Sequence, residues 1–297
     1  MKNKNSLLPL ISFSFAIILF SCKSENAGWT SLLDKDLSKW DMYLGYRLKN
    51  GYEGQQPADE KGQLIAPVGY NKNEANVFSV DMVNGEPVLH ITGEIYGGVI
   101  TKEDFSNYHL TLKYKWGIKK WEPRLDKLKD SGVLYHSFGE CGNDFWRAWM
   151  PGQEFQVMEG HAGDYWSIIN SAVDIRALLP EGSMNTVADQ SQPFISVGAD
   201  PSRDGFCLRS ANYESPVNEW TTIELITFGD KSLHIVNGNV VMVLRNSRYV
   251  DNGVARPLTS GKIQIQSEAG EIFYTDIRIK KISGIPADYA SLFVAKR

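Results

Sequence analysis

Residues 221–244 read TTIELITFGDKSLHIVNGNVVMVL, and apolar and polar side chains alternate in three short runs of this stretch, at residues 221–226, 232–236 and 239–244. Alternation with a period of two is typical of a half-buried β-strand, because successive side chains point to opposite faces. Asn237-Gly238 separates the last two runs and favours a type I′ turn, in which both central residues need a positive φ. The stretch therefore predicts antiparallel strands and a tight hairpin.

The same alternation recurs along the rest of the chain. Further strands are predicted at residues 88–92, 108–116, 132–136, 154–159 and 262–266. Only short stretches, such as residues 287–295, have a helical pattern. Many strands without alternating helices indicate an all-β fold, a two-sheet sandwich or jelly roll. We expect residues 28–297 to form one such domain, because this length is ordinary for a single all-β unit.

Composition excludes several classes of protein. The 297 residues carry 31 Lys and Arg against 35 Asp and Glu, a net charge of −4, and 42% of them are hydrophobic, so the chain is too apolar to be disordered. A mildly acidic chain without basic runs lacks the positive charge that binds phosphates, and we expect no nucleic-acid partner. Three Cys are too few for a disulfide scaffold. Cys141 and Cys207 either form one bridge or stay as buried thiols, and the sequence leaves both open.

The N-terminal residues 1–21 have the features of a secretory signal peptide: two Lys precede an apolar stretch that is too short to span a bilayer as a mature helix. Residues 19–22, LFSC, resemble a bacterial lipobox, in which the Cys is lipidated. We therefore expect a lipid anchor on Cys22, a polar tether at residues 22–27, and a protein facing the periplasm or the cell surface of a Gram-negative-type bacterium. The alternative is plain secretion with a free Cys22.

Two segments lack strand periodicity, residues 117–129 and residues 160–216. Compact domains rarely keep long structureless connections unless these build a site or a lid. We expect both segments to be loops that lie over the concave face of one sheet.

Candidate catalytic side chains concentrate on the predicted strand at residues 154–159. Alternation sends Phe155 and Val157 into the core and presents Glu154 and Gln156 outward. A one-residue bulge would return Glu159 to the same polar face. These three side chains would then line one groove.

His136 is expected to join this groove, because alternation in residues 132–136 places it on the same kind of face. Together with Glu154 and His161 it could bind a divalent metal ion that polarises a substrate carbonyl. The sequence has no tight cluster of His and carboxylate ligands, so whether a metal cofactor is bound stays open.

The pattern Glu154-x-Gln156-x-x-Glu159 resembles the catalytic strand of glycoside hydrolase family 16, E-x-D-x-x-E. The resemblance implies a retaining glycosidase in which Glu154 is the nucleophile and Glu159 the acid/base. Gln156 replaces the middle Asp of that pattern, and a neutral amide cannot raise the pKa of the acid by like-charge repulsion.

A wider resemblance covers nearly the whole chain from residue 28 to residue 282. Six segments, taken in order, are similar to the 3-keto-disaccharide hydrolase family: residues 28–40, 105–110, 130–136, 154–158, 218–223 and 261–266. This resemblance implies a concanavalin A-like jelly-roll sandwich of two antiparallel sheets that acts on sugars already oxidised at C3. The family usually has Asn where this chain has Asp130, and it lacks much of residues 160–216.

The implied chemistry is elimination followed by hydration. A ketone at C3 acidifies the C2 hydrogen, so a base can remove it, the C1 aglycone leaves, and water adds back. His136 or Glu154 is the expected base, with Glu159 and Gln266 next. The substrate would be a glycoside or oligosaccharide, and a companion sugar 3-oxidoreductase would have to make the ketone.

Further side chains are expected to bind the sugar. Trp146 and Trp166 could stack on the C–H faces of a pyranose, and hydrogen-bonding candidates are Gln156, Gln266, Glu268, Arg147 and His161. Each of them also has an ordinary structural interpretation, as a packed or solvated side chain. A third hypothesis is therefore a non-catalytic carbohydrate-binding module of the same fold.

Overall fold

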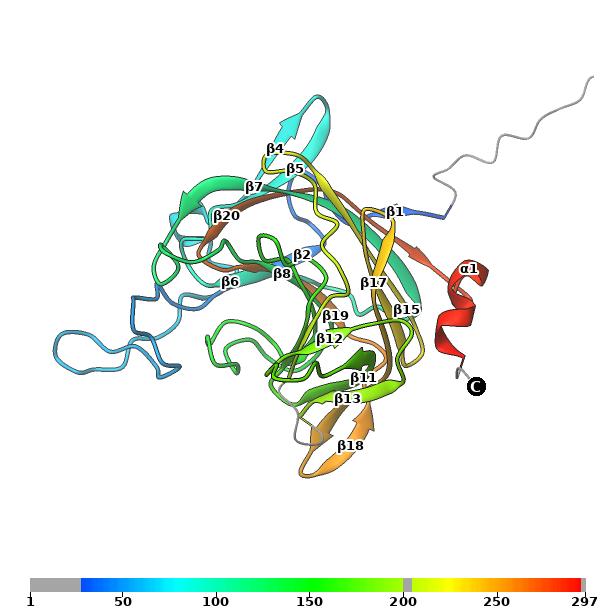
Figure 1. Ribbon diagram of the computed structural model, residues 1–297. Coiled ribbons are helices and arrows are strands. Elements are labelled where there is room, and N and C mark those ends of the chain that lie inside the picture. Colours follow the sequence, from blue (N-terminus) through cyan, green and yellow to red (C-terminus); the bar gives the residue numbers. More distant parts are fainter. Residues whose placement is uncertain (1–27, 200–204, 295–297) are drawn as a thin grey trace, which may run out of the picture.

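The computed structural model describes residues 28–199 and 205–294, and almost all regular structure in these residues is β-strand. Two curved sheets, here named A and B, pack against each other as a jelly-roll sandwich (Figure 1). The predicted all-β class is confirmed. The predicted signal peptide, Cys22 and the tether lie outside the described residues.

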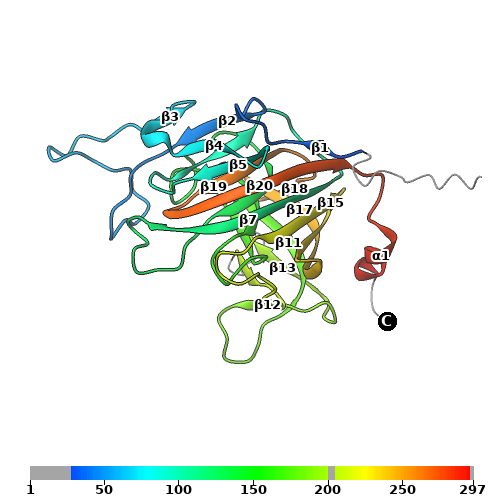
Figure 2. The same ribbon diagram turned by 90° about the horizontal axis from the view of Figure 1, so that it is seen from above.

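Sheet A holds the longest strands, which lie side by side in Figure 2. Its pairing order is β4–β5–β20–β7–β15–β16–β17–β11–β13, with β1 beside the end of β20 and β18 beside the end of β17. The strands are β1 (Thr30–Ser31), β4 (Phe78–Val83), β5 (Glu86–Ile91), β7 (Tyr108–Lys120), β11 (Ser171–Leu178), β13 (Phe194–Gly198), β15 (Thr221–Phe228), β16 (Lys231–Val236), β17 (Asn239–Asp251), β18 (Val254–Pro257) and β20 (Gly270–Lys281). Every pairing in this sheet is antiparallel.

Sheet B has the order β3–β2–β6–β19–β8–β9–β10–β14–β12. Its strands are β2 (Trp40–Leu44), β3 (Gly69–Tyr70), β6 (Gly97–Thr101), β8 (Gly132–Ser137), β9 (Gly152–Gln156), β10 (Tyr165–Ile168), β12 (Thr186–Ala188), β14 (Phe206–Leu208) and β19 (Lys262–Ser267). The pair β12–β14 is parallel, and β12 also pairs with β11 of sheet A. The two sheets are therefore hydrogen-bonded to each other at this edge.

The main core lies between the sheets and is built from alternate residues of each strand. Phe155 and Ile265 of sheet B pack in one cluster with Leu112 and Tyr274 of sheet A. Because Phe155 points inward, Glu154 points to the opposite face of sheet B, as the alternation predicts. This outward face carries the site described below.

The hairpin predicted at Asn237-Gly238 is confirmed. Asn237 has φ 45° and Gly238 has φ 76°, and Val236 on β16 pairs with Asn239 on β17. Both central residues thus have the positive φ that a type I′ turn needs. The other predicted strands are also present, although β9 begins before residue 154 and ends at Gln156.

The prediction that residues 160–216 form a structureless loop is wrong. In the described residues of this segment, 160–199 and 205–216, five strands, β10 to β14, extend both sheets. Several are only three to five residues long, too short for alternation to be recognised. The other predicted loop is shorter than expected, because β7 continues to Lys120.

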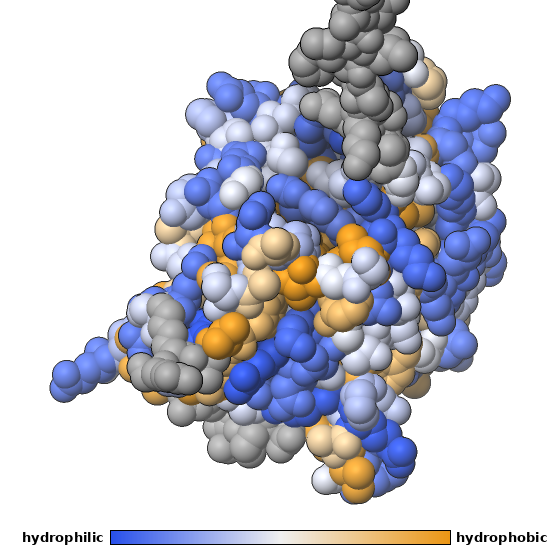
Figure 3. Space-filling model, turned by 90° about the vertical axis from the view of Figure 1, so that its right-hand side faces the viewer, coloured by the Kyte–Doolittle hydropathy of each residue, from blue (hydrophilic) through white to orange (hydrophobic). Residues whose placement is uncertain are grey.

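A short helical segment, α1 (Ala287–Ala290) followed by the 3₁₀ turn η2 (Ser291–Phe293), packs on the outer face of sheet A. Tyr289 and Phe293, within the range predicted to be helical, pack against a cluster formed by Ile226, Leu233, Ile235 and Val243. Figure 3 looks onto this side of the molecule, where apolar residues gather near the centre and hydrophilic ones surround them. A second 3₁₀ turn, η1 (Glu74–Asn76), precedes β4. In residues 28–199 and 205–294 no helix is long and apolar enough to cross a membrane.

Candidate active site

A cavity of about 520 Å³ opens on the outward face of sheet B. Its floor comes from β9 and β19, and its walls come from β10, β14 and the segments before β8 and β9. The polar side chains that line it are Arg124, Asp130, Asp144, Glu154, Gln156, His161, Ser167, Asn185, Gln266 and Glu268. The sequence-predicted residues Glu154, Gln156, Gln266, Glu268, Trp146, His161 and Trp166 are thus brought together.

Glu154 and Gln266 form the centre of the floor, on either side of Gly132. A Cβ atom at Gly132 would overlap the Oε1 atoms of both side chains, so only glycine leaves them room. Both are buried, and neither Oε1 nor Nε2 of Gln266 makes a hydrogen bond of good geometry among the described residues, although the amide is close enough to Glu154 to oppose the rise in its pKa. A buried amide without partners is costly unless a ligand or water satisfies it. Gln266 is therefore placed to bind a polar substrate group.

Burial raises the pKa of Glu154 well above its usual value, and the nearby Asp130 carboxylate raises it further. A carboxyl group whose pKa is raised in this way is, once it has lost its proton, a stronger base than an ordinary carboxylate. These are the properties of a group that transfers protons.

Behind this floor, Arg124 bridges two buried carboxylates. It forms an ion pair with Asp130, and its Nη1 lies 3.4 Å from Oε1 of Glu268. Burial raises the pKa of both carboxyl groups, while Arg124 opposes the rise. The cation therefore compensates the negative charge that would otherwise gather next to Glu154.

Aromatic rings form the walls. Trp166 is 40% exposed and packs on Phe206 with ring centroids 4.4 Å apart. On the other side, Trp146 stacks on Tyr52 at 5.8 Å. Such rings offer flat apolar surfaces for the C–H faces of a sugar.

His161 lies at the rim. Its Nδ1 is 3.0 Å from Oδ2 of the buried Asp164 and 3.1 Å from Nη1 of Arg209. Both contacts involve the same ring nitrogen, so Nε2 is left for a substrate. Arg209 also binds Asp164 at 3.0 Å, which fixes the imidazole from behind.

The expectation that His136 lines this groove is wrong. β8 carries an extra residue against β19, and His136 takes φ 53° at this bulge. The bulge turns the imidazole between the sheets, 6.2 Å from the Tyr108 ring and 5.2 Å from the Tyr135 ring. Burial lowers the pKa of His136 to about 4. Its side chain is a neutral core group in this structure.

Glu159 and Arg147 also lie outside the cavity. β9 ends at Gln156, so the expected bulge within the strand does not form, and Glu159 pairs with Lys129 at 3.5 Å. Arg147 donates from Nε to the carbonyl of Gly54 at 2.8 Å and anchors that segment. The pair Glu154 and Glu159 therefore does not form a dyad in the cavity.

Several lining residues were not predicted as site residues. Asp144 accepts hydrogen bonds from the backbone N–H groups of Trp146, Ala148 and Trp149 and so shapes one wall. Arg124 and Asp130 come from segments far from Glu154 in the chain. The one sequence signal for Asp130 is its place in the Asp130-Ser131-Gly132 motif before β8.

In the described part of the chain, no group of three or more His, Cys, Asp or Glu side chains is arranged to hold a metal ion. The trio considered from the sequence is divided, because His136 faces the core while Glu154 and His161 face the cavity. Cys141 and Cys207 are both unpaired thiols.

Comparisons with known proteins give the following relatives. A protein from Parabacteroides distasonis, provisionally assigned as a glycosyl hydrolase, aligns with 87% of this chain and 96% of its own, with 15% identity and a TM-score of 0.47. The family 16 endo-β-1,3(4)-glucanase SCLam aligns with 86% and 92%, with 11% identity and a TM-score of 0.42. The carbohydrate-binding module CBM66 from Bacillus subtilis aligns with 69% and 92%, with 9% identity and a TM-score of 0.38.

A search of curated protein sequences finds no match. A family model does match, over residues 28–280, and it describes a 3-keto-alpha-glucoside-1,2-lyase-like domain. This range contains every residue that lines the cavity on sheet B. The chain belongs to the 3-keto-alpha-glucoside-1,2-lyase-like family.

Proposed function

We propose that this protein cleaves 3-keto-glycosides by elimination and hydration at the cavity on sheet B. The observation that carries the proposal is the pairing of a buried carboxyl with a raised pKa, Glu154, and a buried amide, Gln266, whose polar atoms make no hydrogen bond of good geometry among the described residues. Elimination next to a ketone needs a base for the C2 hydrogen and a donor for the C3 oxygen. The family to which the chain belongs supports a carbohydrate substrate.

In this mechanism the ionised Glu154 removes the C2 proton. The electron pair of the C2–H bond moves to the C3 oxygen as an enolate, and Nε2 of Gln266 donates a hydrogen bond to that oxygen. The enolate then expels the C1 aglycone, whose oxygen takes a proton. Water adds across the C1–C2 double bond of the enone, its oxygen to C1 and a proton to C2, so the sum is hydrolysis.

His161 is the candidate acid for the leaving oxygen. It lies at the rim, where the aglycone must depart, and Asp164 and Arg209 hold its Nδ1 so that Nε2 is available. Gln156, Glu268 and the rings of Trp146 and Trp166 would orient the sugar.

The retaining-glycosidase alternative has less support, because Glu159 lies outside the cavity and pairs with Lys129. A non-catalytic binding module is the other alternative. Either one would leave a 3-keto-glucoside without C2 exchange.

The decisive experiment follows aglycone release from 4-nitrophenyl 3-keto-glucoside and from the unoxidised glucoside, with the reaction run in D₂O. We expect rapid release from the keto compound alone, with deuterium at C2 of the product. Cleavage of the unoxidised glucoside without C2 deuterium would support a glycosidase instead. Absence of release from either compound would leave only binding.

We further propose that Cys22 carries a lipid anchor and that a sugar 3-oxidoreductase supplies the ketone. Support comes from the lipobox-like residues 19–22 and from the chemistry of the proposed substrate. Incorporation of radiolabelled palmitate in the native host, and its loss in Cys22→Ala, tests the anchor. Incubation with an unoxidised glucoside and a purified 3-dehydrogenase tests the coupling, because aglycone release should need both proteins.

A further inference from the structure

A second cavity, of about 700 Å³, lies on the outer face of sheet A, on the side of the sandwich away from the candidate active site. Its floor is formed by β5, β7 and β20, whose intervening side chains, such as Leu112 and Tyr274, point into the core. None of the residues that line it lines the cavity on sheet B. Any ligand bound at this surface would therefore not touch the residues of the candidate active site.

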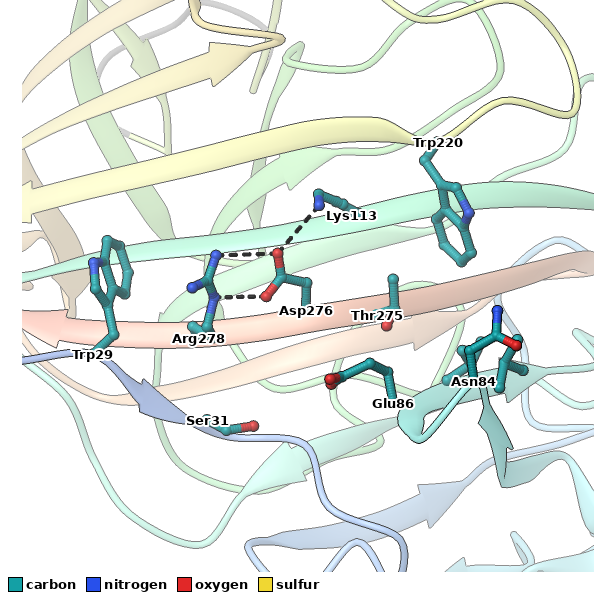
Figure 4. A pocket seen from close by; sticks show the side chains of 11 residues that line it. Trp29, Ser31, Asn84, Glu86, Lys113, Trp220, Thr275, Asp276 and Arg278 are labelled. Carbon is teal, nitrogen blue, oxygen red and sulfur yellow. Dashed lines mark hydrogen bonds and ion pairs between the residues drawn. The ribbon is translucent and has the colours of Figure 1, made fainter. Parts of the chain in front are cut away.

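Two tryptophans stand at its opposite ends, Trp29 just before β1 and Trp220 just before β15 (Figure 4). Both are only partly buried. The guanidinium of Arg278 lies 5.6 Å from the Trp29 ring centroid, and the ammonium of Lys115 lies 5.0 Å from the Trp220 ring centroid. These cation–π contacts restrict the orientation of the two rings. Two large aromatic surfaces are therefore fixed at the edges of one shallow cavity.

The pairing of the strands fixes the spacing of the two platforms. Thr221, next to Trp220, lies opposite Tyr114 on β7, whereas Thr30, next to Trp29, lies opposite Ile279, which in turn lies opposite Leu110. Each Trp lies one residue further out than its Thr, so the two rings start from positions six residues apart along β7 and three strand spacings apart across the sheet, a separation of roughly 25 Å. A monosaccharide or disaccharide could not reach both rings.

Between the rings lies a polar strip (Figure 4). Asp276 takes φ 55° at a bulge of β20, which aims its side chain into the cavity. Its carboxylate contacts Nζ of Lys113 at 3.3 Å and Nε of Arg278 at 2.6 Å. A strained residue at a bulge is often retained for function, and this cluster presents hydrogen-bond donors and acceptors side by side.

The charges in the cavity balance, since Asp276 and Glu86 offset Lys113 and Arg278. An anionic polymer would meet two carboxylates, whereas the hydroxyl groups of a neutral sugar can use both the donors and the acceptors. We propose that this surface binds a neutral oligosaccharide longer than a disaccharide, with sugar rings stacked on Trp29 and Trp220 and hydroxyls bound to the Asp276 cluster. It would hold a glycan chain on the protein, whatever reaction the other cavity performs.

The test is calorimetric titration of the mature chain with cellohexaose, maltohexaose and xylohexaose, and with cellobiose as the short probe. We expect at least one hexasaccharide to bind at least tenfold more tightly than cellobiose. The double variant Trp29→Ala/Trp220→Ala should weaken that binding at least tenfold. Lack of binding of all three hexasaccharides to the wild type would overturn the proposal.

Trp166→Ala is the matched control, because it removes an exposed ring from the other cavity. It should leave hexasaccharide affinity unchanged, and an equal loss in Trp166→Ala would move the binding to the cavity on sheet B and overturn the proposal. The double variant should keep the wild-type melting temperature within a few degrees. The double variant should also release nitrophenol from the 3-keto-glucoside at the wild-type rate. This second measurement tests the proposed reaction separately from oligosaccharide binding at the cavity on sheet A.

Discussion

Glu154 and Gln266 meet above the Cα atom of Gly132, in space that any side chain at residue 132 would need. We expect Gly132→Ala to displace both groups and to abolish aglycone release. Overpacking of a tight site of this kind costs about 1–3 kcal/mol of stability. Gly284→Ala is the control, because a Cβ there meets nothing within 4 Å. Normal turnover in Gly132→Ala would contradict the proposed floor of the site.

Glu154→Gln removes the proposed base while it keeps the shape of the side chain. We expect kcat to fall about 10²–10⁴-fold, the usual contribution of a positioned base, with little change in KM. Because burial raises the pKa of Glu154, activity of the wild type should increase with pH in a range above that of an ordinary carboxyl group. Rates between pH 4 and 9, together with C2 deuterium exchange, measure both effects. A kcat within tenfold of wild type would assign the base elsewhere.

Arg124→Met leaves Asp130 and Glu268 buried without their cation. Breaking a buried ion pair on one side costs about 3–5 kcal/mol, so urea denaturation at pH 7.5 should show a loss of this order. The loss should shrink at pH 5, because the two carboxyl groups, whose pKa values are raised, then take up protons. Arg256→Met, which breaks an exposed pair with Asp251, should change stability by less than about 1 kcal/mol.

The buried His136 predicts that the folded protein becomes less stable at acid pH. Its pKa falls from 6.5 to about 4 on folding, so the unfolded chain binds more protons between these values. Stability should therefore be lost as the pH falls from 6.5 towards 4. His136→Asn, which tolerates the positive φ, should reduce this acid sensitivity in thermal melts at pH 5 and pH 8. Some acid sensitivity should remain in the variant, because burial also lowers the pKa of His234, to about 3.

The same variant tests the geometry of the site. Since the imidazole lies between the sheets, His136→Asn should release nitrophenol from the 3-keto-glucoside at a rate within about threefold of wild type at pH 8. A loss as large as that of Glu154→Gln would restore His136 as a candidate base.

Alternation along the chain was sufficient to predict most of the fold and the outward direction of Glu154 and Gln156. The prediction failed at His136 because β8 has one extra residue there, which turns the side chain to the opposite face of the sheet. No residue type at this position indicates such a bulge in the sequence. The prediction failed at Glu159 because β9 ends three residues earlier. Arg124 could not be assigned from sequence to Asp130 and Glu268, since only the folded sheet brings these distant positions into contact.

Residues 160–216 were expected to contribute to the site, and they supply His161, Trp166 and Phe206 to its walls. Four of these strands, β10, β12, β13 and β14, were missed because they are only three to five residues long, and the longer β11 has one partner, β17, far along the chain. The alternation of polar and apolar residues therefore indicated which segment contributes to the cavity, but not the strands from which its walls are built.

The pairing of β8 with β19 means that the cavity on sheet B depends on strands far apart in the chain. Gln266 and Glu268 join Glu154 only when the strands from residue 262 onward are in place, so a nascent chain that has not yet released these strands lacks the floor of the site. Assembly of such distant pairings is slow compared with that of local contacts. The cavity on sheet B is thus complete only after the whole sandwich has folded, and a fragment that ends before residue 262 lacks Gln266 and Glu268 from its lining.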